Sequence, residues 1–243
     1  MNLILLKITA VCKRWRSTAL ECAILWKNIA FSTSVWSTVQ CARLFLGRSK
    51  QAALSIYIWD SGCTEDLEID QSSNELLESV SAQAHRISTC QLSSSSHDFW
   101  RRWVLPAPNL RKLLVHGHGP EAPPVFRGEF PRLEAFTSQY CTTWPLGNYT
   151  TLTRAELRNN NRHVTLMSLL EALAGCRMLE RLILEGYGRF KQETALLTPI
   201  HLPHLQRLDL LSSDSALILE HLDSCGGPNL QLQCDKSGLW LFQ

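Results

Sequence analysis

One stretch of the sequence matches a motif for cofactor binding. Residues 117–122 read Gly-His-Gly-Pro-Glu-Ala, which fits the Gly-x-Gly-x-x-Ala pattern of dinucleotide-binding turns. In such proteins a helix starts at the turn and directs its N-terminal N–H groups at the pyrophosphate. Here Pro120, Pro123 and Pro124 interrupt the stretch, so no helix is expected. We therefore predict a loop at this position and no cofactor-binding residues.

Two pairs of histidines could each supply two metal ligands. The pairs are His116 with His118 and His201 with His204. Neither pair is accompanied by cysteine or carboxylate residues at the spacing of a zinc site, so we interpret them as turn and rim histidines. The sequence also holds no Gly-x-Ser-x-Gly elbow for a nucleophilic serine and no Walker loop. We predict that the chain has no catalytic or metal-binding residues and is not an enzyme.

The composition is that of a folded protein without a polyanionic partner. Of the 243 residues, 45% are hydrophobic and 19% are charged, which is typical of a globular chain. The formal net charge is only +2. A protein that binds nucleic acid usually clusters Lys and Arg to neutralise several phosphates, whereas the densest basic spots here are the short segments 13–16 and 101–102. We therefore expect no nucleic-acid partner.

The cysteines and the first residues predict a compartment. None of the nine cysteines forms a Cys-x-x-Cys pair, and they are dispersed through apolar segments, as expected of reduced cysteines that pack as small hydrophobic residues. The apolar start is interrupted by Lys7 and followed by a basic segment, so it does not fit a secretory signal. No run of about 18 apolar residues occurs. These features predict a cytoplasmic and/or nuclear protein with no membrane partner.

A short phrase recurs along the C-terminal half of the sequence. Each copy consists of a leucine anchor, two spacers, an apolar residue, one spacer and a further residue. The copies are 110–115, 133–138, 152–157, 179–184 and 205–210, and a degenerate sixth starts at Leu230. Successive anchors are 19 to 27 residues apart, in or next to the period of about 20–29 residues that is typical of leucine-rich repeats.

The phrase has a physical interpretation. Its last three residues alternate in, out and in, which predicts a short strand with one buried face, and the anchor is expected to pack into the same interior from the preceding turn. One repeat cannot cover its own apolar face, so neighbouring repeats must stack. We predict an α/β fold, an irregular leucine-rich-repeat-like solenoid. Because Ser138 stands at an apolar position and the usual turn Asn or Cys is missing, a mixed parallel-strand α/β domain without solenoid geometry is the alternative.

Further elements are expected between and before these copies. Periodicity and flanking residues predict helices at 73–80, 164–175 and 214–222 and strands at 54–58 and 87–92. Ser73 opens the first of these helices with a capping-box pattern. At the N-terminus one helical stripe is formed by Leu5, Ile8, Cys12 and Trp15, a pattern that an ordinary core helix would share.

The N-terminal segment and the order of later motifs resemble a known family. Val11-Cys12-x-x-Trp15-Arg16-x-x-Ala19 followed by Leu25-Trp26-x-x-Ile29 resembles the second half of an F-box. The later motifs are Ala53-Leu54-Ser55-Ile56, His85-Arg86 to Leu92, the Pro-x-Leu-x-x-Leu repeats and Leu152-Thr153 to Leu157. In this order they are similar to the F-box proteins with degenerate leucine-rich repeats that are abundant in mushroom-forming (basidiomycete-type) fungi. The resemblance covers nearly the whole chain.

The resemblance implies a short N-terminal helical F-box remnant that binds a Skp-type adaptor and, through it, a cullin. The matching adaptor-binding residues are Leu5, Ile8, Val11, Cys12, Trp15, Leu25 and Trp26. The family's opening Leu-Pro-x-Glu helix and the proline before its Leu-Trp pair are missing, so an F-box truncated at its N-terminus is expected. The implied organisation is partial F-box-like helices at 1–32, a connecting helix at 33–50 and a leucine-rich-repeat-like domain at 51–243.

The outward strand positions predict a binding surface. In stacked repeats these positions line one face, and here they carry both signs of charge, which suits a protein partner better than a polyanion. The residues are Lys112, His116, Arg154, Glu156, Arg158, Arg181, Glu185, Arg207 and Asp209. The resemblance implies a substrate-recognition subunit of an SCF-type (Skp–cullin–F-box) ubiquitin ligase that holds an unknown protein substrate on this face. The alternative is a ligase-independent leucine-rich-repeat scaffold whose decayed F-box only caps the core.

Overall fold

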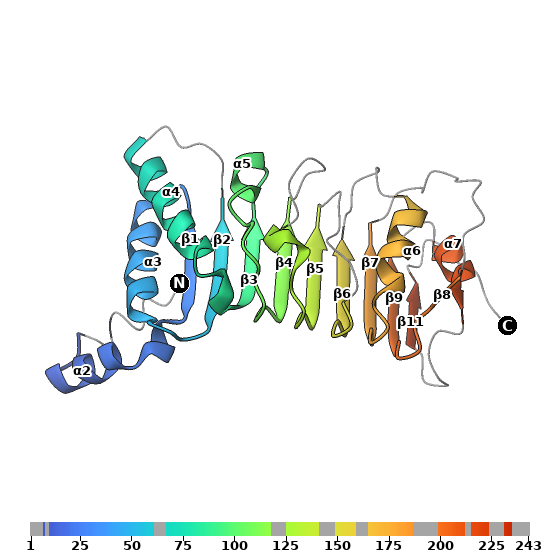
Figure 1. Cartoon of the computed structure of the whole chain (residues 1–243), viewed down its shortest axis with the longest axis horizontal. Coiled ribbons are helices and arrows are strands. Elements are labelled where there is room, and N and C mark those ends of the chain that lie inside the picture. Colours follow the sequence, from blue (N-terminus) through green and yellow to red (C-terminus); the bar gives the residue numbers. More distant parts are fainter. Residues whose placement is uncertain are drawn as a thin grey trace. The chain divides into compact units, whose positions relative to one another are not determined.

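The chain forms two compact units built around parallel β-strands. A computed structural model describes residues 7, 10–60, 67–117, 125–140, 149–158, 165–186, 199–211, 215–223 and 231–234 (Figure 1). The first unit comprises residues 1–110 and 123–129, and the second comprises residues 111–122 and 130–243. Within each unit the strands of the main sheet lie side by side in the order in which they occur in the sequence.

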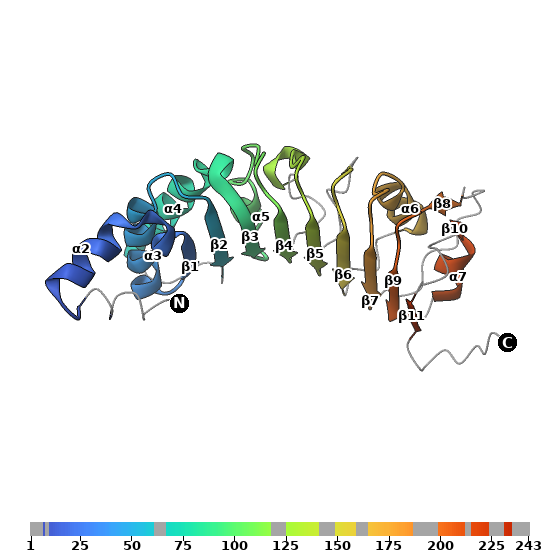
Figure 2. The same ribbon diagram turned by 90° about the horizontal axis from the view of Figure 1, so that it is seen from below.

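The first unit combines three parallel strands with most of the helices. Its strands are β1 (Asn28–Ser32), β2 (Leu54–Trp59) and β3 (Ile87–Ser93). Its helices are α2 (Lys13–Glu21), α3 (Trp36–Arg48), α4 (Leu67–Ser81) and α5 (His97–Trp100), with the 3-10 helices η1 (Ala23–Trp26), η2 (Ala84–Arg86) and η3 (Val125–Gly128). Figure 2 shows α3 and α4 on one side of these strands, so the alternate buried strand residues have a helical layer to pack against.

A tryptophan joins three elements in the core of the first unit. Trp26 is 0% exposed, and its ring meets Phe45 edge to face with the ring centroids 5.0 Å apart. The guanidinium of Arg48 lies 4.5 Å from the Trp26 centroid, and the Trp26 Nε1–H donates to the carbonyl of Ala19 at 2.7 Å. A buried indole with a satisfied N–H combines a large apolar area with a fixed orientation. Trp26 therefore connects η1 to α2 and α3.

Arg86 fastens the turn after α3 to the start of β3. Its guanidinium donates to the carbonyls of Ala52 at 2.9 Å and Ser49 at 3.4 Å, and to the Ser49 hydroxyl at 3.0 Å. Burial lowers the pKa of Arg86 below its ordinary value, because desolvation disfavours the charged form. The oxygen acceptors around the guanidinium offset part of that penalty, as required for a buried charged group.

The second unit has six parallel strands in the order β4-β5-β6-β7-β9-β11. They are β4 (Lys112–His116), β5 (Ala135–Gln139), β6 (Arg154–Arg158), β7 (Arg181–Glu185), β9 (Arg207–Leu211) and β11 (Gln231–Cys234). The helices are α6 (Leu166–Ala174) and α7 (Ser215–Glu220). Two short strands, β8 (Ile200–His201) and β10 (Leu222–Asp223), pair in a separate parallel ladder.

The anchors of the recurring phrase have the predicted role. All five, Leu110, Leu133, Leu152, Leu179 and Leu205, are at most 1% exposed. The backbone N–H of each anchor donates to the carbonyl three residues earlier at 3.0 to 3.3 Å, so each anchor ends a tight turn before its strand. The expectation that the anchor enters the core from this turn is confirmed, and the in–out–in strand is confirmed for β4, β5 and β6. In β7 and β9 the middle residues, Ile183 and Asp209, are buried as well.

The predicted fold class is nevertheless wrong. The nine parallel strands and six α-helices of the described residues form an α/β fold, not an irregular leucine-rich-repeat-like solenoid. The phrase specifies only a parallel strand with one buried face, which any such α/β sheet satisfies. In the described parts of the connections the elements differ: α6 lies between β6 and β7, β8 between β7 and β9, and α7 with β10 between β9 and β11. The alternative of a parallel-strand α/β domain describes the chain better.

Two helices begin elsewhere than predicted. α4 starts at Leu67, and Ser73 lies inside it, where its buried hydroxyl donates to the carbonyl of Thr33 at 2.7 Å rather than capping a helix. In the N-terminal segment Cys12 has extended backbone and its Sγ accepts a hydrogen bond from the N–H of Trp15 at 3.5 Å. Cys12 is therefore the N-cap of α2, and the helical stripe is interrupted at this residue.

Candidate functional site

One face of the six-stranded sheet in the second unit carries the predicted binding residues. Along β4, β5 and β6, buried residues alternate with residues that are exposed or half-buried. The strand register aligns the latter with their counterparts on β7 and β9 in three rows. The first row is Lys112, Ala135, Arg154, Arg181 and Arg207; the second is Leu114, Thr137, Glu156, Ile183 and Asp209; the third is His116, Gln139, Arg158, Glu185 and Leu211. We call this surface the open face; it brings together all the predicted substrate-face residues.

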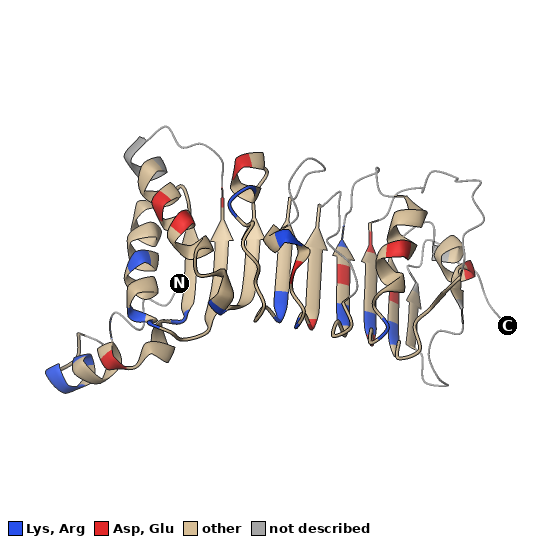
Figure 3. Cartoon of the chain, in the orientation of Figure 1, with Lys and Arg blue, Asp and Glu red and all other residues tan. Residues whose placement is uncertain are grey.

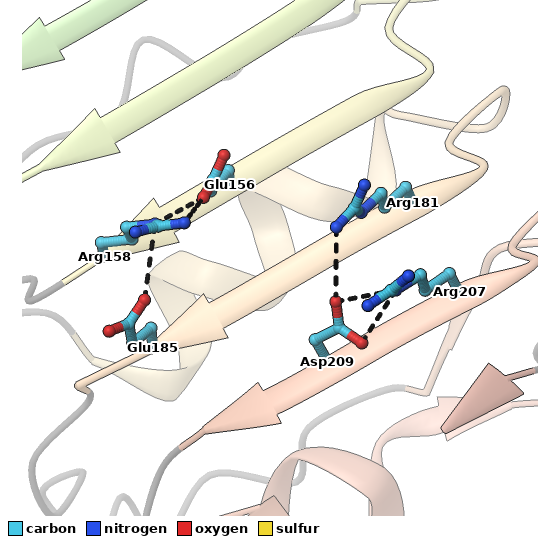
Figure 4. A network of polar contacts seen from close by, with 6 residues as sticks. All are labelled: Glu156, Arg158, Arg181, Glu185, Arg207 and Asp209. Atoms are coloured by element: carbon cyan, nitrogen blue, oxygen red, sulfur yellow. Dashed lines mark hydrogen bonds and ion pairs between the residues drawn. The ribbon is translucent and has the colours of Figure 1, made fainter. Parts of the chain in front are cut away.

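Ion pairs cross the open face between β6 and β7. Figure 4 shows Arg158 between two carboxylates, those of Glu156 on its own strand and Glu185 on the next. The Nε of Arg158 lies 3.4 Å from Oε2 of Glu185, and the same guanidinium hydrogen-bonds Glu156. All three side chains are at least 27% exposed, so water screens these pairs and each contributes little to stability.

Asp209 is the least exposed charged side chain of the open face. Only 6% of its side chain is exposed, and it accepts two hydrogen bonds from Nε of Arg207, at 2.9 and 3.1 Å. Nη2 of Arg181 lies 3.7 Å from the same carboxylate (Figure 4). One carboxylate thus neutralises two guanidiniums only in part, so Asp209, Arg181 and Arg207 together carry a net positive charge.

Basic residues gather at the N-terminal ends of these strands. Lys112, Arg154, Arg181 and Arg207 are the first residues of β4, β6, β7 and β9, and Figure 3 shows basic positions at one end of these strands. The register places Arg181 directly beside both Arg154 and Arg207. We call these four residues the cationic row. Within the described residues, Lys112 and Arg154 form no ion pair.

An aromatic pair lies at the other end of β4 and was missed by the sequence analysis. The rings of His116 and Tyr140 meet edge to face with centroids 5.2 Å apart, and Tyr140 is 51% exposed. Tyr140 follows β5 in a left-handed backbone conformation with φ of 55°. Strand alternation would place residue 140 inward, after the outward Gln139, so it could not have predicted this exposure; the left-handed backbone at Tyr140 breaks the alternation. Exposed aromatic residues are frequent in protein interfaces.

The predicted adaptor-binding residues fall into an exposed and a buried group. Leu5 and Ile8 lie outside the described residues. Val11, Cys12 and Trp15 are exposed, Leu25 is half-buried and Trp26 is fully buried. Ile24, which the sequence analysis did not select, is 59% exposed, compared with 57% for Trp15 and 68% for Val11. Ala19 is the one buried residue of α2, so this helix leaves nearly all of its surface uncovered.

We searched the described residues for clusters that could bind a metal ion. Within this part of the chain no group of three His, Cys, Asp or Glu residues could hold a metal ion. Burial raises the pKa of the Cys176 thiol to about 11, so it is protonated and unreactive at neutral pH. A pocket of about 450 Å³ beside α6 and β8 has no carboxylate or thiol in its lining, which consists of Ala174, Arg177, Pro199, Ile200, His201 and Pro203.

Asp60 forms a polar cluster at the carboxyl ends of β1, β2 and β3. Its carboxylate accepts hydrogen bonds from the hydroxyls of Thr33, at 2.8 Å, and Ser94. Both hydroxyl residues are buried, at 6% and 3% exposed. The cluster therefore ties the strand ends together, and its geometry fits a structural role rather than proton transfer to a ligand.

Two comparisons with known proteins gave no match. No protein-family model matches it, and no curated protein matches it either. In the part of the chain that the structure describes, no helix is long and apolar enough to cross a membrane. The open face and the exposed residues around α2 are therefore the features that bear on function.

Proposed function

We propose that this chain is a substrate-recognition subunit of an SCF-type ubiquitin ligase, with the open face holding a protein target and α2 with η1 docking a Skp-type adaptor. In this role the chain acts by tethering. It raises the effective concentration of the target near the ubiquitin-charged enzyme and performs no chemistry itself. The proposal combines two surfaces of different character, one polar and one apolar.

The observation that carries the proposal is the composition of the open face. Eight charged side chains of both signs stand in registered rows, with the apolar residues Leu114, Ile183 and Leu211 among them. Interleaved charges favour a protein partner with a matching pattern and disfavour a polyanion that covers the whole face. Because the face belongs to a sheet whose opposite side is buried, its backbone is already ordered, so binding has to order only the exposed side chains.

The exposed apolar surface at α2 supports the adaptor half of the proposal. Val11, Trp15 and Ile24 are each more than half exposed within a short stretch of the chain. A nine-residue helix is marginally stable by itself, and in proteins such a helix is usually stabilised by packing of an apolar face. Here Ala19 alone packs inward, so a partner that covers Trp15 would supply the missing contacts.

Co-purification with a Skp-type adaptor tests the proposal. The full chain is co-expressed with the adaptor, and the amount of adaptor retained is compared between the wild type, Trp15→Ala and Trp36→Ala. Trp36 is a matched control, because it is 46% exposed but lies on α3. We expect Trp15→Ala to lose the adaptor and Trp36→Ala to retain it. Trp26→Ala is a poor probe, since Trp26 is part of the core.

The result that overturns the ligase role is equally specific. If a folded wild-type chain retains no adaptor, or if Trp15→Ala retains as much as the wild type, α2 is not an adaptor-docking helix. Circular dichroism of each purified variant establishes that the chain is folded. The result does not depend on the identity of the target.

A ligase-independent interaction scaffold is the second candidate, and the burial of Trp26 favours it. Trp26 contacts Phe45 and Arg48 of α3, so the end of the F-box-like segment covers the core next to β1. That is the capping role which the scaffold hypothesis assigns to this segment. The same hypothesis expects Val11 and Trp15 to cap the core as well, but both are exposed. A chain that binds its target but no adaptor would favour this candidate.

A further inference from the structure

The cationic row is an unusual arrangement for a stable sheet. Arg154, Arg181 and Arg207 occupy directly registered positions on three adjacent strands. Neighbouring strands are about 4.8 Å apart, and like charges directly opposite one another are destabilising. Lys112 extends the same row on β4, with Ala135 between it and Arg154. The fold therefore retains a line of positive charge where alternating signs would be more stable.

Carboxylates among the described residues neutralise only part of the positive charge of the cationic row. Within this part of the chain, Asp209 is the single carboxylate that contacts Arg181 and Arg207. Lys112 and Arg154 are exposed and form no ion pair within the described part of the chain. In addition, the buried Nε of Arg181, at the centre of the row, has no hydrogen-bond partner there. Because this Nε is buried, an incoming anion meets the exposed side chains of Lys112 and Arg154 instead.

The rest of the open face restricts which anion fits. The next row, about 6.7 Å further along the strands, carries the carboxylates of Glu156 and Asp209 beside Leu114 and Ile183. A nucleic-acid backbone that covers this width would meet those carboxylates and be repelled. A peptide can place carboxylates over the first row and apolar side chains over the second. Arginine is well suited to such a partner because it binds a carboxylate through two parallel hydrogen bonds.

We propose that the cationic row binds the carboxylates of an acidic segment in the protein target, with Arg154 as the principal contact. This inference rests on the proposed function, because it specifies the chemistry of the target that the open face holds. The acidic segment lies across the N-terminal ends of β4, β6, β7 and β9. Its apolar side chains contact Leu114, which is half-buried.

A binding measurement with a defined probe tests the inference. The probe is a fluorescein-labelled peptide that alternates Asp or Glu with Leu, and fluorescence anisotropy gives its affinity for the full chain. We expect Arg154→Glu to weaken binding by about tenfold, as is typical for reversal of a central interface charge, and Lys112→Glu by less. Arg177→Glu is the matched control, because this exposed arginine follows α6 outside the open face. The Arg177→Glu variant should bind the peptide with the same affinity as the wild type.

Three results would overturn the inference. The first is that a peptide with Gln and Asn in place of Glu and Asp binds as tightly as the acidic peptide. The second is that a short single-stranded DNA binds more tightly than the acidic peptide, and the third is that Arg154→Glu and Arg177→Glu weaken peptide binding equally. The outcome is separable from that of the proposed function. A chain that retains the adaptor but ignores the acidic peptide loses only this inference, and one that binds the peptide but no adaptor loses only the ligase role.

Discussion

The two units share parallel strands but differ in the chemistry of their outward strand residues. In the first unit the half-buried and exposed strand residues carry no charge: they are Asn28, Ala30, Ser32, Ser55, Tyr57, Trp59, Ser88, Thr89, Gln91 and Ser93. In the second unit the equivalent positions of β4 to β9 carry eight charged side chains. The first unit instead has a buried arginine, Arg86, whose guanidinium bonds to backbone and hydroxyl oxygens in the interior.

This difference suggests that buried polar contacts stabilise the fold, whereas exposed charged residues are available for binding a partner. Buried polar contacts such as those of Arg86 and Trp26 contribute to folding because their loss leaves unpaired groups in the core. Exposed ion pairs such as that of Arg158 with Glu185 contribute little to folding but present charge to a partner. We therefore expect substitutions in the interior of the first unit to affect stability, and substitutions on the open face of the second unit to affect binding.

The largest expected effect on stability comes from Trp26. We expect Trp26→Ala to lower the free energy of unfolding by about 3–5 kcal/mol, because it opens a cavity beside Phe45 and leaves the Ala19 carbonyl without its donor. Trp15→Ala is the control and should change it by less than about 0.5 kcal/mol, since Trp15 is exposed. Urea denaturation measures both. Equal losses would contradict the division of the two tryptophans into core and surface.

Arg86 is expected to have the next largest effect. Arg86→Ala removes the guanidinium that donates to the carbonyls of Ser49 and Ala52, and we expect the free energy of unfolding to fall by about 2–3 kcal/mol. These charge-assisted hydrogen bonds are lost and the half-buried Ala52 carbonyl loses its donor, whereas the Ser49 carbonyl keeps the N–H of Ala52. Arg101, whose side chain is 65% exposed, serves as the control. Arg101→Ala should leave the denaturation midpoint unchanged. A small effect at Arg86 would show that the turn after α3 is held by other contacts.

Asp209 allows the comparison to be sharpened within the open face. We expect Asp209→Asn to cost about 1 kcal/mol, because a shielded charge-assisted hydrogen bond to Arg207 is weakened. Glu185→Gln, at an exposed pair, should be neutral within about 0.5 kcal/mol. Thermal denaturation compares the two variants. The Asn variant should also bind the acidic peptide more tightly than the wild type, since the cationic row then has less compensation.

The smallest effect is expected at an exposed pair of the first unit. Nη2 of Arg43 lies 2.7 Å from Glu75, and this hydrogen bond holds the pKa of the Glu75 carboxyl below its ordinary value. A carboxyl with a lowered pKa in the folded state stabilises the fold above its unfolded pKa, and the contribution disappears as the pH falls through the folded pKa. Wild type and Glu75→Gln should therefore differ slightly at pH 7 and not at all at strongly acidic pH. A difference that grows on acidification would reverse this assignment.

The sequence predicts individual elements better than the fold. The alternation of Leu113 with Val115, and of Ile56 with Ile58, located β4 and β2 because a half-buried strand has a period of two residues. The strand predicted at 87–92 and the helices at 164–175 and 214–222 correspond to β3, α6 and α7. The fold class was wrong because the phrase describes strands and is silent about the connections between them.

The first residues of the helices and the polar contacts between remote residues could not be predicted from the sequence. Ser73 has the local pattern of a capping residue, but its partner, the carbonyl of Thr33, is remote in sequence. The same holds for Arg86 with Ser49, and for the sharing of Asp209 by arginines of two strands. Strand alternation predicted the outward residues of β4 and β6, but on β7 and β9 it did not predict that Ile183 and Asp209 are buried.

The central claim is that one chain holds an acidic target and a Skp-type adaptor at the same time on separate surfaces. The measurement that tests it most directly is the affinity of the labelled acidic peptide for the chain alone and for the purified chain–adaptor complex. Independent surfaces have no coupling free energy, so we predict the same affinity within about twofold and a complex that contains all three components. Displacement of the adaptor by the peptide, or a chain that cannot bind both, would contradict the account.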